Sequence, residues 1–408
     1  MLYLKLAWRN IWRNRRRTFI TMLSVIVAVM LSSVMRTMNE GSYENMIENT
    51  VGTFTGYIQI HHQGYWEEKT LDYTFLSSDT LFEKAEGLKE VSHAIPRLES
   101  YALVAGKEQS RAAMVIGIDP KAEKALSDPE SKIKNGRYFQ SLDEQAVLMG
   151  IDLMERLNVQ TGDSLVMIGQ GFRGQSAAGL YEIKGAVQFP NPEMNKSLVM
   201  MPLETVQNFL AAPDRLSAIS IILDSPENVD QVSSVLKKEI SSEEYEVMDW
   251  KELMPELVQA IESDRGSGLI IIMILYVVVG FGILGTVLMM ITERTYEFGV
   301  MISVGTPRLA IAVMLAFEVF LIALSGAAIG IVVSFPISMY FHYNPIRLSG
   351  GDMAEVIETF GMEPVLQFSL EPSLFYSQAV IIFWITLIFC LYPILKASRL
   401  NPVKAMRS

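Results

Sequence analysis

Four long apolar runs stand out along the chain, separated by polar stretches. They cover residues 18–38, 268–291, 309–341 and 373–395. Each is long enough to cross about 30 Å of hydrocarbon as an α-helix that rises about 1.5 Å per residue. The third run is longer than this requires and contains Pro336, so we expect its helix to kink, tilt or extend beyond the lipid. The pattern predicts a membrane protein with four transmembrane α-helices.

The longest polar stretch separates the first two apolar runs. Residues 39–267 form a segment of 229 residues with 37 acidic and 20 basic side chains, which gives a net charge of −17. A segment of this length is a domain rather than a loop. Alternating patterns typical of strands and 3.6-residue patterns typical of helices follow one another within it. We therefore predict a large mixed α/β domain outside the membrane.

Similar strand and helix patterns occur near both ends of this domain. Near its start, a helical pattern over 78–88 precedes a strand-like stretch over 91–104. Near its end, a strand-like stretch precedes a helical pattern over 227–240. The expected inward face of this second helix comprises Val229, Val232, Leu236 and Ile240. The arrangement predicts two lobes, one built from both ends of the domain and a more β-rich one around residues 110–205 between them.

Basic residues next to the apolar runs predict the orientation in the membrane. Residues 1–17 contain six lysines and arginines and no acid, and residues 396–408 contain four and no acid. Basic segments beside spans stay on the cytoplasmic side, so both termini are predicted to be cytoplasmic. With four spans, the domain at 39–267 and a loop at 342–372 then lie on the outer side. A loop at 292–308 lies in the cytoplasm.

The first residues of the chain also follow a helical pattern. Within MLYLKLAWRNIWRN, the apolar stripe comprises Leu4, Trp8, Ile11 and Trp12, and the basic stripe comprises Lys5, Arg9 and Arg13. Such a helix lies flat at the level of the lipid headgroups, so we expect an interfacial helix within 1–17. The alternative is a plain basic anchor that sets the topology. A cleaved signal peptide is disfavoured, because no small-x-small site follows the first apolar run.

Composition and charge exclude several classes of protein. A formal net charge of −11 argues against a nucleic-acid-binding face, which needs a clustered positive potential. The single cysteine, Cys390, excludes an internal disulfide and a cysteine-rich zinc site. Adjacent His61 and His62 lie on a strand-like stretch, where neighbouring side chains point to opposite faces and cannot chelate one ion. We expect both histidines at the surface and no metal.

Nucleotide-binding and hydrolytic motifs are also missing from the sequence. Residues 169–174 spell G-x-G-x-x-G, but the residues that follow resemble a flexible hairpin loop and not a helix. Gln175 stands where a phosphate-binding loop requires lysine. Neither H-E-x-x-H nor G-x-S-x-G occurs. We therefore expect a chain that is not an enzyme and has no cofactor of its own.

A short helix with a defined stop is predicted in the cytoplasmic loop, which reads TERTYEFGVMISVGTPR. A glycine and a proline, Gly305 and Pro307, follow its apolar stretch and indicate where the helix ends. A two-turn amphipathic helix on a cytoplasmic loop is typical of a docking element, and the alternative is a plain charged connector. The candidate docking residues are Glu293, Arg294, Glu297, Phe298, Gly299 and Gly305.

The motifs of this loop and of the tail resemble a known family. ERTYEFGVMISVGT is similar to the R-x-x-E-I-G-x-x-x-A-x-G-A signature of the FtsX-like permeases of ABC transporters. Phe298 replaces the usual isoleucine and Ser303 an alanine, which are mild departures. The tail also resembles that of the family, through Ala397, Arg399, Pro402, Ala405 and Arg407. The stretches GIDP, NGRYF and EQAVLMGIDLMERLNVQTGDSL resemble the periplasmic domain of macrolide-exporter and lipoprotein-releasing permeases, so the resemblance covers nearly the whole chain.

This resemblance implies the partners of the chain. Permeases of this family act as dimers, with a second copy or a paralogue, and the loop after the second span docks onto one of two ATPase domains. Since no ATPase is fused here, ATP and magnesium are expected on separate ATPase subunits. Further expected partners are a periplasmic carrier or adaptor, a lipoprotein or other hydrophobic cargo, and membrane lipid. The chain itself would transmit motion between the ATPases and the periplasmic domain.

Several residues inside the spans are candidates for helix packing. Glu318 lies in the third run, where an unpaired carboxylate is costly, so we expect it to link helices, although proton transfer and access to water stay open. Gly326 and Gly330 form a small-xxx-small face on the same run. Gly280 and Gly285 give the second run a similarly thin surface.

The resemblance favours a lipoprotein-releasing permease of the bacterial inner membrane, because the chain is long and carries no ATPase. Acylated proteins would then enter between the first two spans, lined at matching height by Val34, Met38, Ile274 and Val278. The alternatives are an exporter of peptides or drugs with a separate ATPase, an adaptor and an outer-membrane duct, and a regulator of a cell-wall enzyme. A secondary transporter driven through Glu318 is disfavoured, because four spans without an inverted repeat are few.

Overall fold

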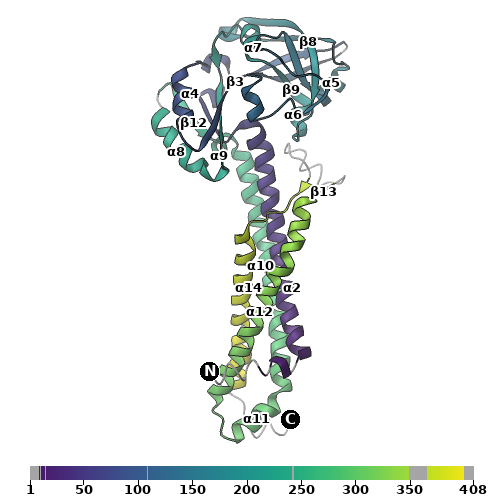
Figure 1. The fold of residues 1–408 in the computed structure, drawn as a ribbon, viewed down its shortest axis with the longest axis vertical. Coiled ribbons are helices and arrows are strands. Elements are labelled where there is room, and N and C mark those ends of the chain that lie inside the picture. The colour runs from purple at the N-terminus through teal and green to yellow at the C-terminus, as the bar shows by residue number, and fades with distance from the viewer. Residues whose placement is uncertain are drawn as a thin grey trace. The chain divides into compact units, whose positions relative to one another are not determined.

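The chain folds into two compact units in the computed structural model, which describes residues 9, 11–13, 15–107, 109–240, 243–348 and 365–398. The helical unit comprises Met1–Glu44, Ile261–Arg347 and Val365–Ser408. The α/β unit comprises Asn45–Ala260 and Leu348–Pro364. Figure 1 shows long helices in the first unit and a strand-rich body in the second.

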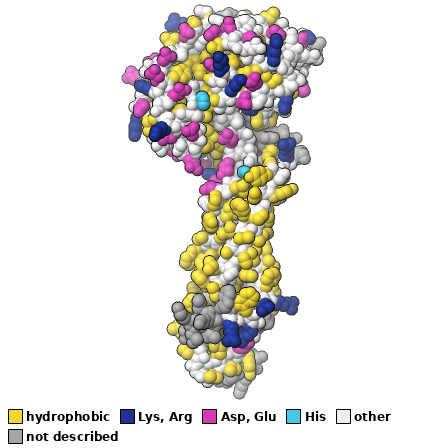
Figure 2. Space-filling view, in the orientation of Figure 1, with side chains coloured by type: hydrophobic (Ala, Val, Ile, Leu, Met, Phe, Trp, Pro, Cys, Tyr) yellow, Lys and Arg dark blue, Asp and Glu magenta, His cyan; other side chains and the backbone are white. Residues whose placement is uncertain are grey.

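Four long helices make up most of the helical unit. In the described part of the chain, these four are long and apolar enough to cross a membrane, which confirms the predicted number of spans. Figure 2 shows that hydrophobic side chains dominate their visible faces, whereas acidic and basic side chains are spread over the α/β unit. The four are α2 (Arg15–Ile47), α10 (Pro255–Glu293), α12 (Arg308–Tyr343) and α14 (Pro372–Ser398).

The first two helices extend well beyond the predicted spans. α2 continues past Met38, and the π-helical segment η1 (Glu48–Thr55) follows it directly. α10 begins before the predicted start at residue 268. An apolar run marks only the part of a helix that suits lipid, and polar residues can continue the helix in water. The α/β unit therefore spans 45–260 within this region, in place of the predicted 39–267.

Glycines bring α2 and α12 into close contact. A Cβ atom on Gly326 would lie 2.8 Å from Cβ of Val25, and one on Gly330 would lie 2.7 Å from Cβ of Val29. Both valines are fully buried. The two helices thus approach each other where only glycine leaves room, as small residues permit between transmembrane helices.

The two glycines of α10 that were predicted to pack, Gly280 and Gly285, differ from each other. A Cβ atom on Gly280 would lie 2.7 Å from the ring of Phe389 in α14, so Gly280 packs as predicted. Around Gly285, no described atom lies within 4 Å of such a Cβ. The packing role expected for Gly285 is therefore not seen within the described part of the chain, because no other helix of the unit reaches this face of α10.

α12 and the loop after it complete the helical unit. α12 continues through Pro336, so this proline does not end the helix. Within the predicted loop at 342–372, the short strands β13 (Ile346–Arg347) and β14 (Val365–Leu366) pair in antiparallel fashion.

Parts of three predicted segments lie outside the described residues. Residues 1–8, 10 and 14 belong to the predicted interfacial helix, 349–364 to the loop at 342–372, and 399–408 to the tail.

A ten-stranded sheet forms the body of the α/β unit. Its order is β12-β1-β11-β3-β4-β9-β6-β8-β5, and β7 pairs with both β3 and β8. The pairs β4–β9 and β6–β8 are parallel. The first lobe contains β1 (Ile58–His62), β11 (Ala218–Leu223), β12 (Tyr245–Asp249), α4 (Asp79–Glu86) and α8 (Val229–Ile240). The second lobe contains β4 (Ser110–Ile118), β5 (Ile133–Gly136), β6 (Ala146–Gly150), β7 (Ser164–Gln170), β8 (Ser176–Val187), β9 (Leu198–Pro202), α5 (Ile151–Leu157), α6 (Pro192–Ser197) and α7 (Leu203–Phe209).

Short elements connect these strands and helices. They are α3 (Tyr65–Glu68), η2 (Leu71–Tyr73), β2 (Phe75–Leu76), η3 (Ala122–Ala125), η4 (Phe172–Gly174), β10 (Arg215–Leu216), η5 (Pro226–Asn228) and α9 (Trp250–Leu253).

The long strand β3 (Val91–Ala105) belongs to both lobes. It pairs with β11 up to Arg97 and with β4 from Arg97 onward. At this junction Arg97 is fully buried, and its guanidinium lies 2.5 Å from the carboxylate of the buried Glu123. The Nη1 atom of Arg97 donates to the carbonyl oxygen of Phe54 at 2.5 Å. The junction is therefore held by a buried, hydrogen-bonded ion pair.

Local predictions within the α/β unit have mixed outcomes. The inward residues expected on α8 are buried, from Val229 to Ile240. No helix follows residues 169–174, but the flexible hairpin loop expected after them is wrong. Residues 176–187 form strand β8, because they pair with β7 and β6 in the sheet. His61 corrects the expectation of two surface histidines. It is fully buried, because β1 runs between β11 and β12 while Tyr65 and Trp66 cover its ring. Burial lowers the pKa of His61 to about 3, so the ring is neutral at pH 7.

Candidate coupling site between α10 and α12

The loop between α10 and α12 contains a separate short helix, α11 (Thr295–Ser303), at one end of the helical unit (Figure 1). α10 ends at Glu293 because the next residue, Arg294, leaves the helical conformation with φ −101° and ψ 5°. The short helix predicted from the sequence is thus present in the structure.

α11 ends in a turn that requires glycine. Gly305 has a φ of 104°, which residues with a Cβ rarely adopt. Its N–H donates to the carbonyl oxygen of Ile302 at 3.0 Å, and the N–H of Thr306 donates to that of Met301 at 2.9 Å. These two bonds form a Schellman motif, which closes the end of a helix. Pro307 then precedes α12, so the predicted stop is observed.

A buried ion pair anchors α11 to α12. The side chain of Arg294 is 4% exposed and that of Glu318 is 1% exposed. The Nη1 atom of Arg294 donates to both carboxylate oxygens of Glu318, at 3.0 and 3.2 Å. The guanidinium carbon also lies 5.1 Å from the ring centre of Phe298, which is fully buried. The carboxylate of Glu318 is therefore held by a residue at the start of the loop helix.

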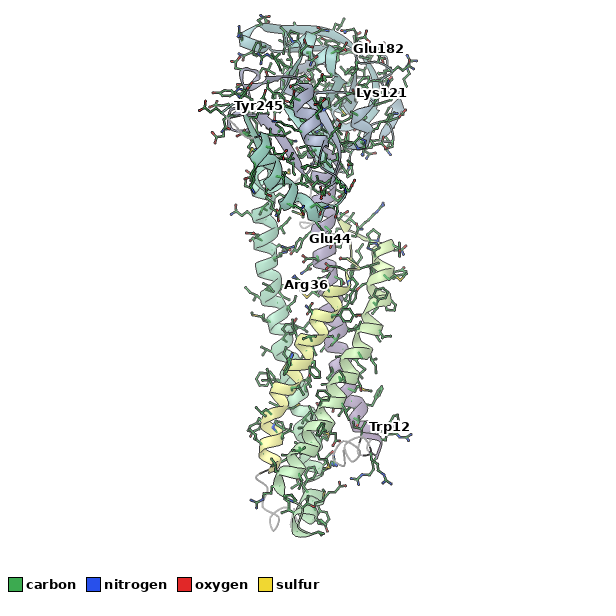
Figure 3. The ribbon with its side chains drawn as sticks, turned by 60° about the vertical axis from the view of Figure 1, so that its left-hand side comes forward. Trp12, Arg36, Glu44, Lys121, Glu182 and Tyr245 are labelled. Carbon is green, nitrogen blue, oxygen red and sulfur yellow. The ribbon has the colours of Figure 1, made fainter. Side chains whose placement is uncertain are left out.

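A second, exposed ion pair joins α11 to the segment before α2. The Nη2 atom of Arg13 donates to Glu297 at 2.6 Å, and the same carboxylate oxygen lies 3.5 Å from Nε of Arg294. Figure 3 shows the neighbouring Trp12 at one end of the helices. Exposed pairs of this kind contribute only about 0.2–1 kcal/mol to stability. Through both pairs, α11 contacts the segment before α2 as well as α12.

Three exposed apolar residues lie on the outward side of α11 and of the residue that follows it, and we call them the α11 ridge: Tyr296, Val300 and Val304. Their exposed fractions are 59%, 38% and 83%. Spacing by four residues places them on one side of the helix. Phe298 and Gly299 are buried on the other side. The ridge was not predicted from the sequence, although its members follow an i, i+4, i+8 spacing there.

The predicted coupling residues all lie in this one loop. Most of them hold α11 in place. The ridge, rather than these residues, forms most of the exposed apolar surface. Arg294, Phe298 and Gly299 are buried, Glu293 and Glu297 are exposed, and Gly305 forms the terminal turn.

Polar contacts also fasten α2 to α10 far from α11 along the chain. Arg265 of α10 forms an ion pair with Glu40 of α2 at 2.6 Å. The hydroxyl of Tyr43 donates to the carboxylate of Asp264 at 2.5 Å. We call these two contacts the α2–α10 clasp. The apolar runs of the sequence do not predict the α2–α10 clasp, because its members are polar residues of different segments.

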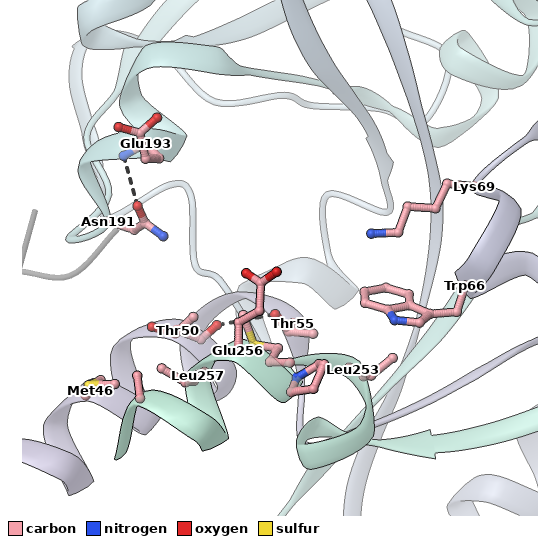
Figure 4. A pocket seen from close by; sticks show the side chains of 13 residues that line it. Met46, Thr50, Thr55, Trp66, Lys69, Asn191, Glu193, Leu253, Glu256 and Leu257 are labelled. Atoms are coloured by element: carbon pink, nitrogen blue, oxygen red, sulfur yellow. Dashed lines mark hydrogen bonds between the residues drawn. The ribbon is translucent and has the colours of Figure 1, made fainter. Parts of the chain in front are cut away.

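The α/β unit holds a cavity of about 580 Å³ (Figure 4). Its wall combines the end of α2 and η1, the start of α10, and residues near α3 and α6. The Nζ atom of Lys69 lies 4.0 Å from the ring centre of Trp66. Glu193 and Leu257 lie on other parts of the wall. The cavity therefore offers an aromatic surface, a cation and a carboxylate to a bound group.

The residues proposed to line a cargo path are all partly or largely exposed. Ile274 and Val278 of α10 are 59% and 63% exposed, one turn apart. Val34 and Met38 of α2 are partly buried. None of the four lines the cavity of the α/β unit. Their role as a lining stays a prediction.

Comparisons with known families match both units. The MacB-like periplasmic core domain matches residues 18–239, and the FtsX-like permease C-terminal region matches residues 269–402. Lipoprotein-releasing system transmembrane protein LolC of Neisseria meningitidis is 21% identical, over 97% of this chain and 95% of its own length. Macrolide export ATP-binding/permease protein MacB of Shewanella oneidensis is 22% identical, over 99% of this chain and 60% of its own length.

A solved structure also resembles part of the chain. The periplasmic region of MacB from Actinobacillus actinomycetemcomitans covers 53% of this chain and 97% of its own length, with 17% identity and a TM-score of 0.36.

Fold and sequence together define an ABC transporter permease, a multi-pass protein of a bacterial inner membrane. The chain belongs to the FtsX-like permease family and carries a MacB-like periplasmic core domain.

Proposed function

We propose that this permease transmits the motion of separate ATPase subunits in the cytoplasm to its α/β unit outside the membrane. The observation that carries the proposal is the construction of α11. Its ridge is free to contact a partner, while Arg294 and Phe298 fix its other face to the helical unit. A partner that moves the ridge therefore moves the helices as well.

The ATPases supply the chemistry in this scheme. ATP and magnesium bind to two partner subunits, and their closure displaces α11. Because a buried ion pair joins the start of α11 to α12, the displacement reaches α12 instead of being lost in a flexible loop. The segment before α2 follows through the Arg13–Glu297 contact.

The α2–α10 clasp then carries the motion outward. Both helices lead directly into the α/β unit, and the clasp makes them move as a pair. A second permease copy or a paralogue supplies the opposing α/β unit. The cavity beside Trp66 and Lys69 is a candidate contact for a periplasmic carrier or for cargo.

Lipoprotein extraction from the inner membrane is the cargo assignment we favour. The lipoprotein-releasing relative aligns over 95% of its own length, whereas the macrolide exporter aligns over 60% of its own length. The alignment with the former thus covers nearly all of both chains. The second candidate is export with an adaptor and an outer-membrane duct. It is supported by the alignment with the macrolide exporter, which covers 99% of this chain. Identification of the subunits that copurify with the native complex distinguishes lipoprotein release from export.

Substitution of a ridge residue tests the docking step. We expect Val300→Asp to weaken binding of the partner ATPase about 100-fold, because a buried, unpaired carboxylate costs about 3 kcal/mol. The measurement is the dissociation constant of the ATPase for the purified permease in detergent. Leu76→Asp, at a leucine of the α/β unit that is 58% exposed, is the matched control and is expected to bind normally. Equal affinity for both variants contradicts the proposed docking surface.

A further inference from the structure

A groove of about 810 Å³ lies between the beginning of α2 and the middle of α12. From α12 it is lined by Leu321, Ile322, Ser325 and Ile329. From the α2 side its apolar part is lined by Ile11, Trp12, Phe19, Ile20 and Met22, and its polar part by Arg15, Arg16 and Thr18. The proposed transmission of motion assigns no role to this groove.

The apolar part of the groove is open to its surroundings. Phe19 is 57% exposed, Ile20 is 47% exposed, and Ile329 across the groove is 39% exposed. These residues lie on helices that cross the membrane. An apolar surface at this level is in contact with acyl chains rather than water.

The basic part lies where the membrane-spanning stretch of α2 begins. Arg15 and Arg16 are exposed, and no acidic side chain among the described residues forms an ion pair with either. The guanidinium carbon of Arg15 lies 5.5 Å from the ring centre of Trp12, and its Nε atom donates to the carbonyl oxygen of Trp12 at 3.3 Å. Trp12 is itself 53% exposed. Tryptophan and arginine in this combination are typical of the headgroup level.

We propose that this groove is a binding site for an anionic phospholipid, with its phosphate at Arg15 and Arg16 and an acyl chain along Phe19, Met22 and Leu321. Two neighbouring cations that have no acidic partner among the described residues attract an anionic headgroup, and a zwitterionic lipid gains less from them. Basic pockets between transmembrane helices are known to bind anionic headgroups. A second protein chain would instead need acids facing the two arginines.

The site lies on the same short segment as the contact with α11. Arg13, which pairs with Glu297 of α11, precedes Arg15 by two residues. A lipid held at Arg15 and Arg16 therefore restrains the segment through which α11 contacts the start of α2. Binding of lipid in the groove does not rest on the proposed function.

The test measures lipid binding to the full chain without any ATPase, so that its failure is distinct from failure of the proposed function. The probes are phosphatidylglycerol and phosphatidylcholine, titrated into the detergent-purified chain and followed by native mass spectrometry. We expect phosphatidylglycerol to bind preferentially, and the double variant Arg15→Gln/Arg16→Gln to lose about 20-fold in affinity for it. Arg308→Gln, at an exposed arginine outside the groove, is the matched control and is expected to bind as the parent chain does.

A second variant separates the groove from the charge. Ser325→Phe fills the groove beside Ile322 without changing the charge, so it is expected to reduce retention of both lipids. Unchanged binding of phosphatidylglycerol in either variant overturns the proposal, since it then reflects bulk lipid only. Disulfide-linked dimers of a Phe19→Cys variant also overturn it, because a second copy then occupies the groove; the native Cys390 is buried and does not interfere.

Discussion

Removal of the Glu318 carboxylate is expected to destabilise the permease by about 3–5 kcal/mol. In Glu318→Ala, the guanidinium of Arg294 stays buried at 4% exposure and loses both of its bonds to the carboxylate. Breaking a buried ion pair from one side has this cost because it leaves an uncompensated charge in a low-dielectric environment. Unfolding of the purified chain by denaturant in mild detergent measures the change.

Two controls distinguish loss of the pair from general damage. Arg13→Gln removes the exposed pair with Glu297, and we expect it to cost no more than about 1 kcal/mol. The double variant Arg294→Met/Glu318→Met removes both buried charges, and it is expected to recover most of the stability. If Glu318→Ala unfolds at the same denaturant concentration as the parent chain, the buried pair does not anchor α11.

Replacement of Gly326 or Gly330 by leucine is expected to give the second large effect. A Cβ atom at either position would lie less than 3 Å from a buried valine of α2, and a leucine adds three more carbons beyond it. Overpacking of this kind costs about 1–3 kcal/mol at each site. We expect the double variant Gly326→Leu/Gly330→Leu to force α2 away from α12 and to fail to assemble with the ATPase. Thermal unfolding in detergent and ATPase pull-down measure the two effects.

The matched control is Gly282→Leu on α10. No described atom lies within 4 Å of a Cβ at this position, and leucine has a better helix propensity than glycine. We therefore expect the control variant to unfold at the parent temperature or slightly above it. Equal destabilisation of the α10 control and the α12 variants would mean that the close contact with Val25 and Val29 has no special role.

The sequence predicted the spans because lipid imposes a simple requirement, namely apolar side chains along about 20 residues. It did not predict where α2 ends or where α10 begins. Their extensions are polar and are stabilised by contacts between distant segments, such as that of Tyr43 with Asp264. His61 was misplaced for a related reason. An alternating pattern assigns neighbouring side chains to opposite faces, but it does not say whether another segment covers both faces.

Prediction of the coupling site was similarly uneven. The end of α11 was predicted because Gly305 and Pro307 act locally, through a backbone conformation and a missing N–H. The pair of Arg294 with Glu318 was not predicted, because it depends on how α12 folds back beside the loop. The α11 ridge was missed although its spacing is local. Apolar residues occur on both sides of this short helix, so spacing alone does not distinguish the exposed Val300 from the buried Phe298.

The central claim is that ATP acts on the α/β unit through α11, and one distance measurement tests it most directly. Spin labels at Lys121→Cys, an exposed position of the α/β unit, would report the distance between the two permease subunits of the assembled complex. We predict that ATP shifts this distance in the parent complex, and that the shift is lost when Arg294 and Glu318 are both replaced by methionine. An unchanged distance in a parent complex that hydrolyses ATP would contradict the account.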